Sequence, residues 1–168
     1  MTDLLFRGES LLKNSKNEPL LFVFVRHKGC TFCREALSQL SEHKSQLMQR
    51  RVHIFVVHMG PESTSVELEN TYHLQGVEFI SDPDKKFYKA FGLKRGSLNQ
   101  LFGPRIWLRG FQAGVLRGHG IGAIEGDGLQ LGGICLLKNG SLTRLLDPCD
   151  AADTGDWSKI IKELDSHL

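Results

Sequence analysis

The chain has 168 residues, enough for one domain with its own hydrophobic core, and we expect a single domain over residues 1–168. Four cysteines are too few for the disulfide framework of a small secreted protein, and a formal net charge of +2 is too small to indicate nucleic-acid binding. The longest clean apolar run, Leu20–Val25, is far shorter than the roughly 18 residues of a membrane-spanning helix, so we do not expect membrane contact. The first 19 residues lack the features of a signal peptide, from which we expect a cytoplasmic protein.

The first half of the chain alternates apolar strands with amphipathic helices. Leu20–Arg26 is short and apolar on both faces, as is typical of a central parallel strand. Apolar residues then recur at helical spacing and predict a helix that buries Cys33, Ala36, Leu37, Leu40, Leu47 and Met48. A second strand is expected at Val52–Val57.

Three further elements complete this alternating half. Pro61 stands near the start of a predicted second helix, and Val77–Ile80 reads as a third strand. A third helix is expected after it, with Asp82 as its cap, Pro83 in its first turn and Gly92 at its end.

An irregular region follows, in which ten glycines lie between Gly103 and Gly133. We expect a Gly-rich insertion at about residues 95–131, with a short strand at Arg105–Leu108. Eight Lys or Arg and no acidic residue lie between Lys85 and Ile124. This block fits either an anionic ligand or membrane surface, or an ordinary solvated basic face, and we favour the solvated face.

The chain ends with a hairpin and a helix. Two apolar runs flank Asn139-Gly140, a dipeptide typical of tight β-hairpins. Asp156 is expected to cap a helix whose apolar face holds Trp157, Ile160, Ile161 and Leu164. Three strand-helix units, an insertion, a hairpin and a helix predict an α/β protein of thioredoxin-like fold, with a mixed central sheet covered by helices on both faces.

In that fold the motif Cys30-Thr31-Phe32-Cys33 falls where the first strand ends and a helix begins. Reactive sites of open α/β sheets gather at this edge. A cysteine reacts as its thiolate, which the positive end of a helix stabilises, and Lys28 and Arg34 add charge if they point the same way. We expect Cys30 to be the exposed nucleophile at the cap and Cys33, one turn further in, to be the buried resolving thiol.

Two other interpretations of the cysteine pair are less favoured by the sequence. A closed zinc site needs four ligands, but Cys135 stands alone in a strand and Cys149 alone in a loop, so we expect no metal and no bound cofactor. Two merely buried thiols are also less favoured, because this spacing at a strand-to-helix junction is a fairly specific redox signal. His27 and His119 are candidates for proton transfer, although each also fits a structural or surface histidine.

Three segments, FVRHKGCTFCREAL, DPDKKFYKAFGL and GDGLQLGGICLLKNGSL, resemble the AhpC/TSA-like, peroxiredoxin-like family. This is the branch of the thioredoxin superfamily that includes prostamide/prostaglandin F synthase. The resemblance runs from about Leu20 to about Leu146, and is carried most specifically by Arg26-His27, Cys30, Cys33-Arg34-Glu35 and Gln130-Leu131-Gly132-Gly133. It implies a thioredoxin fold, a thiol-based antioxidant or reductase role, and electrons from a thioredoxin- or glutathione-type reductant.

The sequence departs from the family pattern at the site itself. Aligning Cys33 with the cysteine of the peroxiredoxin motif P-x-x-x-T-x-x-C places Arg26 at the proline and Cys30 at the threonine, which leaves open which sulfur is attacked first. Gly132-Gly133 stands where thioredoxins carry a cis-proline, and we expect it to leave open backbone for a substrate. Arg117 is one of the arginines of the insertion that could polarise a peroxide bond.

The sequence therefore predicts a thiol-disulfide oxidoreductase that reduces a peroxide or another oxidised small molecule through Cys30 and Cys33. Thr31, Arg34, His27, Gly132, Gly133 and Arg117 are the expected supporting residues. Apolar side chains and arginines in Leu101–Val115 suit an amphipathic substrate such as a lipid hydroperoxide, or simply pack the insertion onto the sheet. The alternative function is a non-catalytic redox-sensing or partner-binding module.

Overall fold

The computed structural model of the chain describes residues 4–26, 30–96, 127, 129–148 and 153–168. Most of the expected insertion, including the strand predicted at Arg105–Leu108, lies outside the described residues. So do His27, Arg117, His119 and Cys149.

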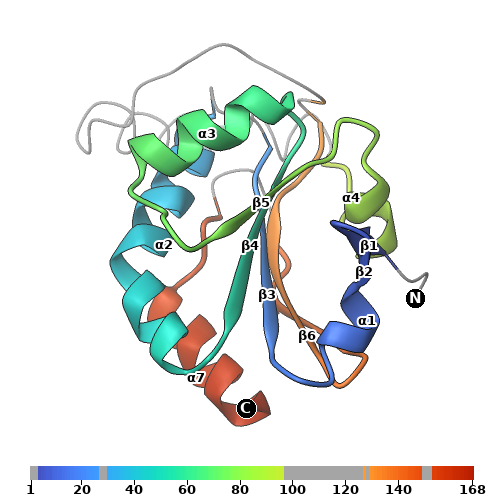
Figure 1. Cartoon of the computed structure of the whole chain (residues 1–168). Coiled ribbons are helices and arrows are strands. Elements are labelled where there is room, and N and C mark those ends of the chain that lie inside the picture. Colours follow the sequence, from blue (N-terminus) through green and yellow to red (C-terminus); the bar gives the residue numbers. More distant parts are fainter. Residues whose placement is uncertain (1–3, 27–29, 97–126, 128, 149–152) are drawn as a thin grey trace.

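The core of the fold is one mixed sheet of five strands in the order β5-β4-β3-β6-β7 (Figure 1). The strands β3 (Leu20–Phe24), β4 (His53–His58) and β5 (Glu78–Ser81) are parallel. Next to β3, β6 (Gly133–Lys138) runs antiparallel and pairs with β7 (Ser141–Leu146) in a hairpin. The predicted fold class is confirmed, because parallel units in the first half and antiparallel strands in the second share one sheet.

Helices cover both faces of this sheet (Figure 1). Along one face lie α2 (Thr31–Gln49) and α7 (Trp157–His167), whose apolar sides share one buried cluster with Leu21 and Val23 of β3. The short helices α1 (Leu11–Asn14) and α4 (Lys86–Ala90) lie on the other side. The helix α3 (Glu62–Thr71) connects β4 to β5.

The face of the sheet toward α4 carries several aromatic side chains. Phe22 of β3 stacks on Phe55 of β4 with ring centroids 4.8 Å apart, and Phe24 lies edge-on to Tyr88 at 5.1 Å. Aromatic pairs of these geometries add to the stabilisation from area burial. The carboxyl end of β3 is therefore held between two packed layers, directly before the cysteine motif.

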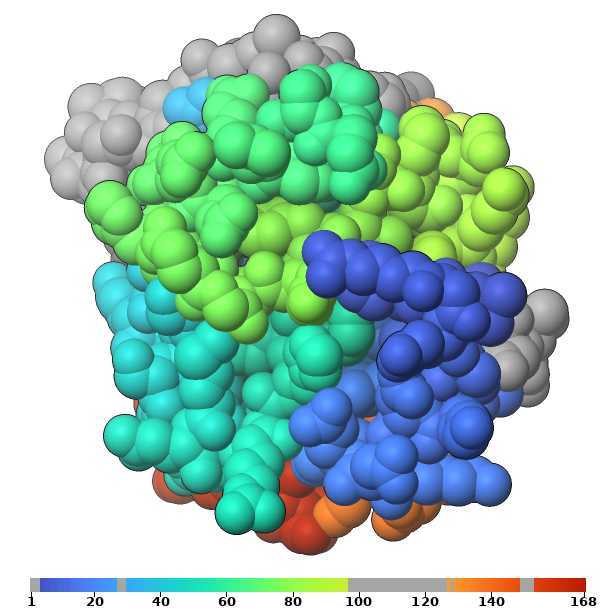
Figure 2. All heavy atoms as spheres, in the orientation of Figure 1, coloured from blue at the N-terminus to red at the C-terminus, as the bar shows by residue number. Residues whose placement is uncertain are grey.

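An N-terminal segment that we did not predict adds to this aromatic face. It consists of β1 (Leu5–Phe6), β2 (Glu9–Ser10) and α1. Phe6 meets Phe55 edge-on at 5.3 Å, and Arg7 forms an ion pair with Glu78 at 3.1 Å. Figure 2 shows the segment, in dark blue, against the yellow-green residues around β5 and α4.

Asp82 caps a helix as predicted, but the helix begins further along the chain than we expected. The Asp82 carboxylate accepts the backbone N–H groups of Lys86 and Phe87, each at 2.8 Å, and so satisfies donors at the helix start. However, α4 begins only at Lys86, because Lys85 adopts a left-handed conformation with φ of 57°. Pro83 therefore lies in the preceding turn and not in the first turn of the helix, as we expected.

The other local signals are confirmed. Asn139 and Gly140 both have positive φ, 51° and 76°, as the two-residue hairpin turn requires. The Asp156 side chain accepts the backbone N–H of Ser158 at 3.0 Å and caps α7, whose buried residues are Trp157, Ile160, Ile161 and Leu164.

The described part of the basic block is compensated by acidic residues from later in the chain. Lys85 and Arg95 both form ion pairs with Asp127, at 2.6 and 3.1 Å. Lys94 pairs with Asp147 at 2.6 Å. These pairs agree with the solvated basic face that we favoured over an anion-binding surface.

Candidate redox site

The two cysteines lie at the junction between β3 and α2, as predicted. Val25 extends the pairing of β3 beyond its last residue, since its N–H donates to the carbonyl of Val57 at 2.9 Å. Cys30 is the N-cap of α2, with the extended backbone typical of that position. Its carbonyl accepts the N–H of Arg34 at 3.0 Å, which closes the first helical turn and brings Cys33 round beneath it.

Both thiols are buried, so our expectation of an exposed Cys30 is wrong. Cys30 and Cys33 each have 7% of their surface exposed. The Cys30 side chain belongs to the same apolar cluster as Val25, Phe32 and Leu37, which explains the burial. The two sulfurs therefore differ in their hydrogen bonds and not in their exposure.

Hydrogen bonds lower the pKa of Cys30. Its pKa is lowered from 9.0 to about 6, and the largest cause is the hydrogen bond with the Cys33 side chain. Burial opposes this effect, while the positive charge of Arg26 and the backbone N–H groups of Cys33 and Phe32 support it. The helix start thus supplies the stabilisation of a thiolate that its position predicted.

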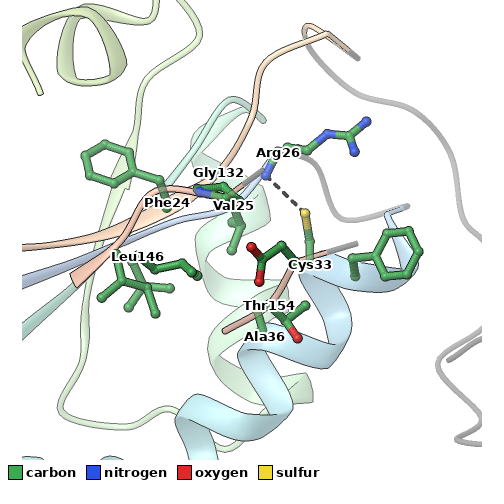
Figure 3. A pocket seen from close by; sticks show the side chains of 14 residues that line it. Phe24, Val25, Arg26, Cys33, Ala36, Gly132, Leu146 and Thr154 are labelled. Carbon is green, nitrogen blue, oxygen red and sulfur yellow. Dashed lines mark hydrogen bonds between the residues drawn. The ribbon is translucent and has the colours of Figure 1, made fainter. Parts of the chain in front are cut away.

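Cys33 in turn receives a hydrogen bond from the strand. The backbone N–H of Arg26 donates to Cys33 Sγ at 3.1 Å, while the guanidinium of Arg26 points away from that sulfur (Figure 3). A sulfur that accepts an N–H is better able to carry negative charge. Both cysteines are therefore supported, by different donors.

The cation that acts on Cys30 is Arg26, which sequence reasoning had not assigned to this role. Arg26 is only 9% exposed, so its charge is weakly screened. Lys28 lies outside the described residues. Arg34 instead acts on Tyr72, whose pKa is raised by burial and lowered in part by this charge. Arg26 directly follows the first strand, and this position at the carboxyl edge is the signal that could have identified it.

Thr31, an expected supporting residue, is the first residue of α2 and is 8% exposed. Arg34 is half-buried on the same helix. The structure thus brings Thr31 and Arg34 into the first turn beside the two cysteines. The expected roles of His27 and Arg117 stay predictions, since both lie outside the described residues.

Gly132 and Gly133 permit a close approach of β6 to the end of β3. A Cβ atom on Gly132 would overlap the carbonyl oxygen of Phe24. Gly133 has φ of 155°, and its backbone is already paired with Phe24 in the sheet. The Gly133 backbone is therefore not the open backbone that we expected for a substrate; the two glycines instead set the spacing of strands beside the site.

A small pocket lies between β3, β6 and α2 and reaches Cys33 (Figure 3). Its walls are mainly apolar, and Arg26, Asp153 and Thr154 contribute polar groups; labelled wall residues in the figure include Phe24, Val25, Ala36, Gly132 and Leu146. Among the described lining residues, the pocket contacts Cys33 and not Cys30. The sulfur that lines the pocket, Cys33, is therefore not the one whose pKa is lowered to about 6.

Cys135 lies in the middle of β6 with no exposed surface, and burial raises its pKa to about 12. The three described cysteines are all free thiols. Within the described ranges, no three His, Cys, Asp or Glu side chains gather in a way that could hold a metal ion. No helix in those ranges is long and apolar enough to cross a membrane.

Comparison with known protein families identifies the family of this chain. The family model described as AhpC/TSA antioxidant enzyme matches residues 39–146. The chain belongs to this family. The matched residues begin after Cys33, so membership in the AhpC/TSA family supports the fold and a redox function, while the roles of the two cysteines depend on the geometry described above.

Relatives of this AhpC/TSA chain carry peroxiredoxin-like names. Peroxiredoxin-like 2A of Xenopus tropicalis is 32% identical over 148 residues, covering 84% of this chain and 60% of that protein. The protein of that name from Xenopus laevis is 30% identical and covers 94% and 73%. Prostamide/prostaglandin F synthase of Salmo salar is 28% identical and covers 92% and 80%. The chain thus spans about 60% of the first of these relatives.

Solved structures agree on the fold. Peroxiredoxin 6 of Arenicola marina, as a mutant, aligns with a TM-score of 0.63 at 13% identity, over 95% of this chain and 65% of that one. A mutant of Xanthomonas campestris peroxiredoxin Q aligns at 0.59 with 12% identity, over 96% and 87%. The resemblance to the peroxiredoxin-like branch and the thioredoxin-like fold are both confirmed.

Proposed function

We propose that the protein is a thiol-dependent oxidoreductase that reduces a peroxide or another oxidised small molecule by cycling Cys30 and Cys33 between dithiol and disulfide. The observation that carries the proposal is the acidity of Cys30, whose pKa of about 6 makes the thiolate its main form at neutral pH. Cys33, the proposed resolving thiol, lies one helical turn further along α2 and is the group that lowers this pKa most. No bound cofactor is needed for this chemistry.

With a hydroperoxide as the substrate, the proposed cycle has three steps. The Cys30 thiolate attacks the terminal oxygen, the O–O bond breaks, and the departing alkoxide takes a proton to become an alcohol, leaving Cys30 as a sulfenic acid. The Cys33 sulfur then attacks the Cys30 sulfur, the S–O bond breaks, and water leaves with the Cys33 proton. A thioredoxin- or glutathione-type reductant finally supplies two electrons by thiol-disulfide exchange.

The hydrogen bond from Arg26 N–H to Cys33 Sγ supports the second step. When Cys33 loses its proton to attack the sulfenic acid, this donor stabilises the developing negative charge. Cys30 is therefore the proposed nucleophile and Cys33 the proposed resolving thiol, although the pocket contacts Cys33.

The pocket favours an oxidised substrate with an apolar group. Its walls from Phe24, Val25 and Leu146 offer apolar contact, and Arg26 and Asp153 add charged groups to the lining. Because Cys33 lines the pocket, a group held there lies beside the proposed resolving sulfur. We propose an organic hydroperoxide as the substrate class and the reducing cytoplasm as the compartment in which the donor thiols are available.

Turnover with thioredoxin and its reductase, measured on an organic hydroperoxide and on hydrogen peroxide, tests the proposal. Cys30→Ser and Cys33→Ser should each abolish turnover, and the matched variant Cys135→Ala should keep it. Turnover that survives in both site variants would contradict the proposal. A single oxidation that thioredoxin does not reverse would instead favour the redox-sensing module.

A second measurement assigns the order of attack. Mass spectrometry after peroxide treatment in the presence of a sulfenic-acid trap should find the adduct on Cys30 in the Cys33→Ser variant. The reciprocal Cys30→Ser variant should give little adduct. An adduct that forms mainly on Cys33 would exchange the two roles while leaving the dithiol cycle intact.

A further inference from the structure

A buried tyrosine lies at the end of β3, on the face of the sheet opposite α2. The Tyr88 hydroxyl donates to the carbonyl of Val25 at 2.5 Å and also lies 3.1 Å from the carbonyl oxygen of Val57. The carbonyl of Val25 and the N–H of Arg26 belong to one peptide group. That N–H donates to Cys33 Sγ at 3.1 Å, so a single planar peptide carries a hydrogen bond at each end.

The hydrogen bonds on this peptide lead toward the cysteine pair. The Tyr88 hydroxyl donates to the Val25 carbonyl, and the Arg26 N–H of the same peptide donates to Cys33 Sγ. Cys33 in turn is the group that lowers the pKa of Cys30 most. In such a chain each bond polarises the next and strengthens it. We infer that Tyr88 is a positioning residue that stabilises the Cys30 thiolate through the Val25–Arg26 peptide. The inference rests on the proposed role of Cys30.

The surroundings of Tyr88 suit this role. Asp82 accepts the Tyr88 N–H at 3.3 Å, and the tyrosine ring packs edge-on against Phe24, so the hydroxyl is fixed from two sides. Burial raises the pKa of Tyr88 well above 10, with smaller contributions from Cys33 and Asp82, so the hydroxyl keeps its proton at neutral pH. Arg26 is the cation that acts on the other end of the chain, at Cys30.

The rate of Cys30 alkylation against pH, measured in the full chain, tests the inference. Tyr88→Phe removes the first donor and should raise the pKa of Cys30 by about half a unit, which lowers alkylation near pH 6 roughly two-fold. A fluorinated tyrosine at position 88 is a stronger donor and should shift the pKa in the opposite direction. The chemical shift of the Arg26 amide proton should change as Cys30 ionises in the wild type, and this change should be smaller in Tyr88→Phe.

Ser15→Ala provides the structural control. Ser15 is buried, and its hydroxyl accepts the N–H of Gly140 at 3.0 Å and donates to Leu12 at 2.8 Å, next to the hairpin turn at the other end of β6. This variant also loses buried hydrogen bonds, but the pKa of Cys30 should stay at its wild-type value. Equal pKa values of Cys30 in Tyr88→Phe and Ser15→Ala would overturn the inference. So would a Cys30 pKa that does not respond to the fluorinated tyrosine.

The two proposals fail separately. If wild-type Cys30 titrates like free cysteine, the proposed function is overturned and the role of Tyr88 falls with it. If wild-type Cys30 is acidic and neither change at Tyr88 moves its pKa, only the role of Tyr88 is overturned. If Tyr88→Phe does not fold, the fluorinated protein decides alone, because it keeps the hydroxyl and the ring.

Discussion

Cys30 and Cys135 are both buried thiols, yet their environments drive their acidity in opposite directions. Cys135, in the middle of β6, pairs across the sheet with Phe22 and has an apolar surrounding, so burial raises its pKa to about 12. Cys30, at the start of α2, loses nearly as much contact with water but gains a thiol, two backbone N–H groups and a guanidinium as partners. The difference teaches that burial makes a cysteine inert only where the fold provides no donors.

Selective labelling gives the largest expected difference between the two thiols. At pH 7 the thiolate fraction of Cys30 should exceed that of Cys135 by a factor on the order of 10⁵, given pKa values of about 6 and about 12. A short exposure of the native protein to iodoacetamide, followed by peptide mass spectrometry, should find Cys30 modified and Cys135 intact. Equal labelling of Cys30 and Cys135 in the native protein would contradict the difference in their pKa values.

The pH dependence of stability should separate the two cysteines next. The pKa of Cys30 is lowered on folding from 9.0 to about 6, so its ionisation stabilises the folded state fully above about pH 9, and this contribution is lost as the pH falls through 6. The unfolding free energy should therefore rise between pH 6 and 9 by at most about 4 kcal/mol more in the wild type than in Cys30→Ser.

Urea denaturation at several pH values measures this difference. Cys135→Ala is the control. Up to about pH 8 the Cys135 thiol is protonated in both the folded and the unfolded state, so its removal should lower the free energy of unfolding by a similar amount at each pH in that range. A wild-type curve parallel to that of Cys30→Ser would contradict the lowered pKa.

Removing the charge of Arg26 should have a smaller effect. Arg26→Met keeps the chain length and the backbone N–H but removes the cation, so the pKa of Cys30 should rise by about one unit. The pH profile of alkylation measures the change. Arg34→Gln is the matched control and should leave the profile in place, because Arg34 is half-buried one turn away and is not among the groups that lower the Cys30 pKa.

Truncating Cys135 should have the smallest effect on the chemistry. Cys135→Ala removes a small buried side chain and should lower the free energy of unfolding by about 1 kcal/mol through the cavity that it leaves. Turnover and the pKa of Cys30 should change by less than the error of the assays. A several-fold loss of turnover in this variant, with folding intact, would show that the two regions are not independent.

The sequence predicted the features that depend on neighbours along the chain. Asn139-Gly140 and Asp156 act within a few residues of themselves, and their turn and cap are where we expected them. The position of Cys30 at a helix start follows from the apolar strand before it and the helical spacing after it. By contrast, β1, β2 and α1 have two to four residues each, too few for a periodic pattern.

The features that the sequence missed depend on contacts between distant segments. The burial of Cys30 arises from packing with other elements, which the spacing of two cysteines does not reveal. Tyr88 lies 63 residues from the carbonyl to which it donates. Gly132-Gly133 was expected to leave open backbone for a substrate, but at Gly132 the carbonyl of Phe24 occupies the position that a side chain would take. In each case the strand order of the sheet had to be known first.

The most direct test of the central claim is a titration of the thiolate by its ultraviolet absorbance, recorded for Cys135→Ala with and without the additional Cys30→Ser substitution. Because Cys30 and Cys33 are coupled, the difference between the two curves gives the first ionisation of this pair, in which Cys30 takes part. It should have its midpoint near pH 6. A midpoint at about 8.5, the value of free cysteine, would contradict the claim that the start of α2 holds a reactive thiolate.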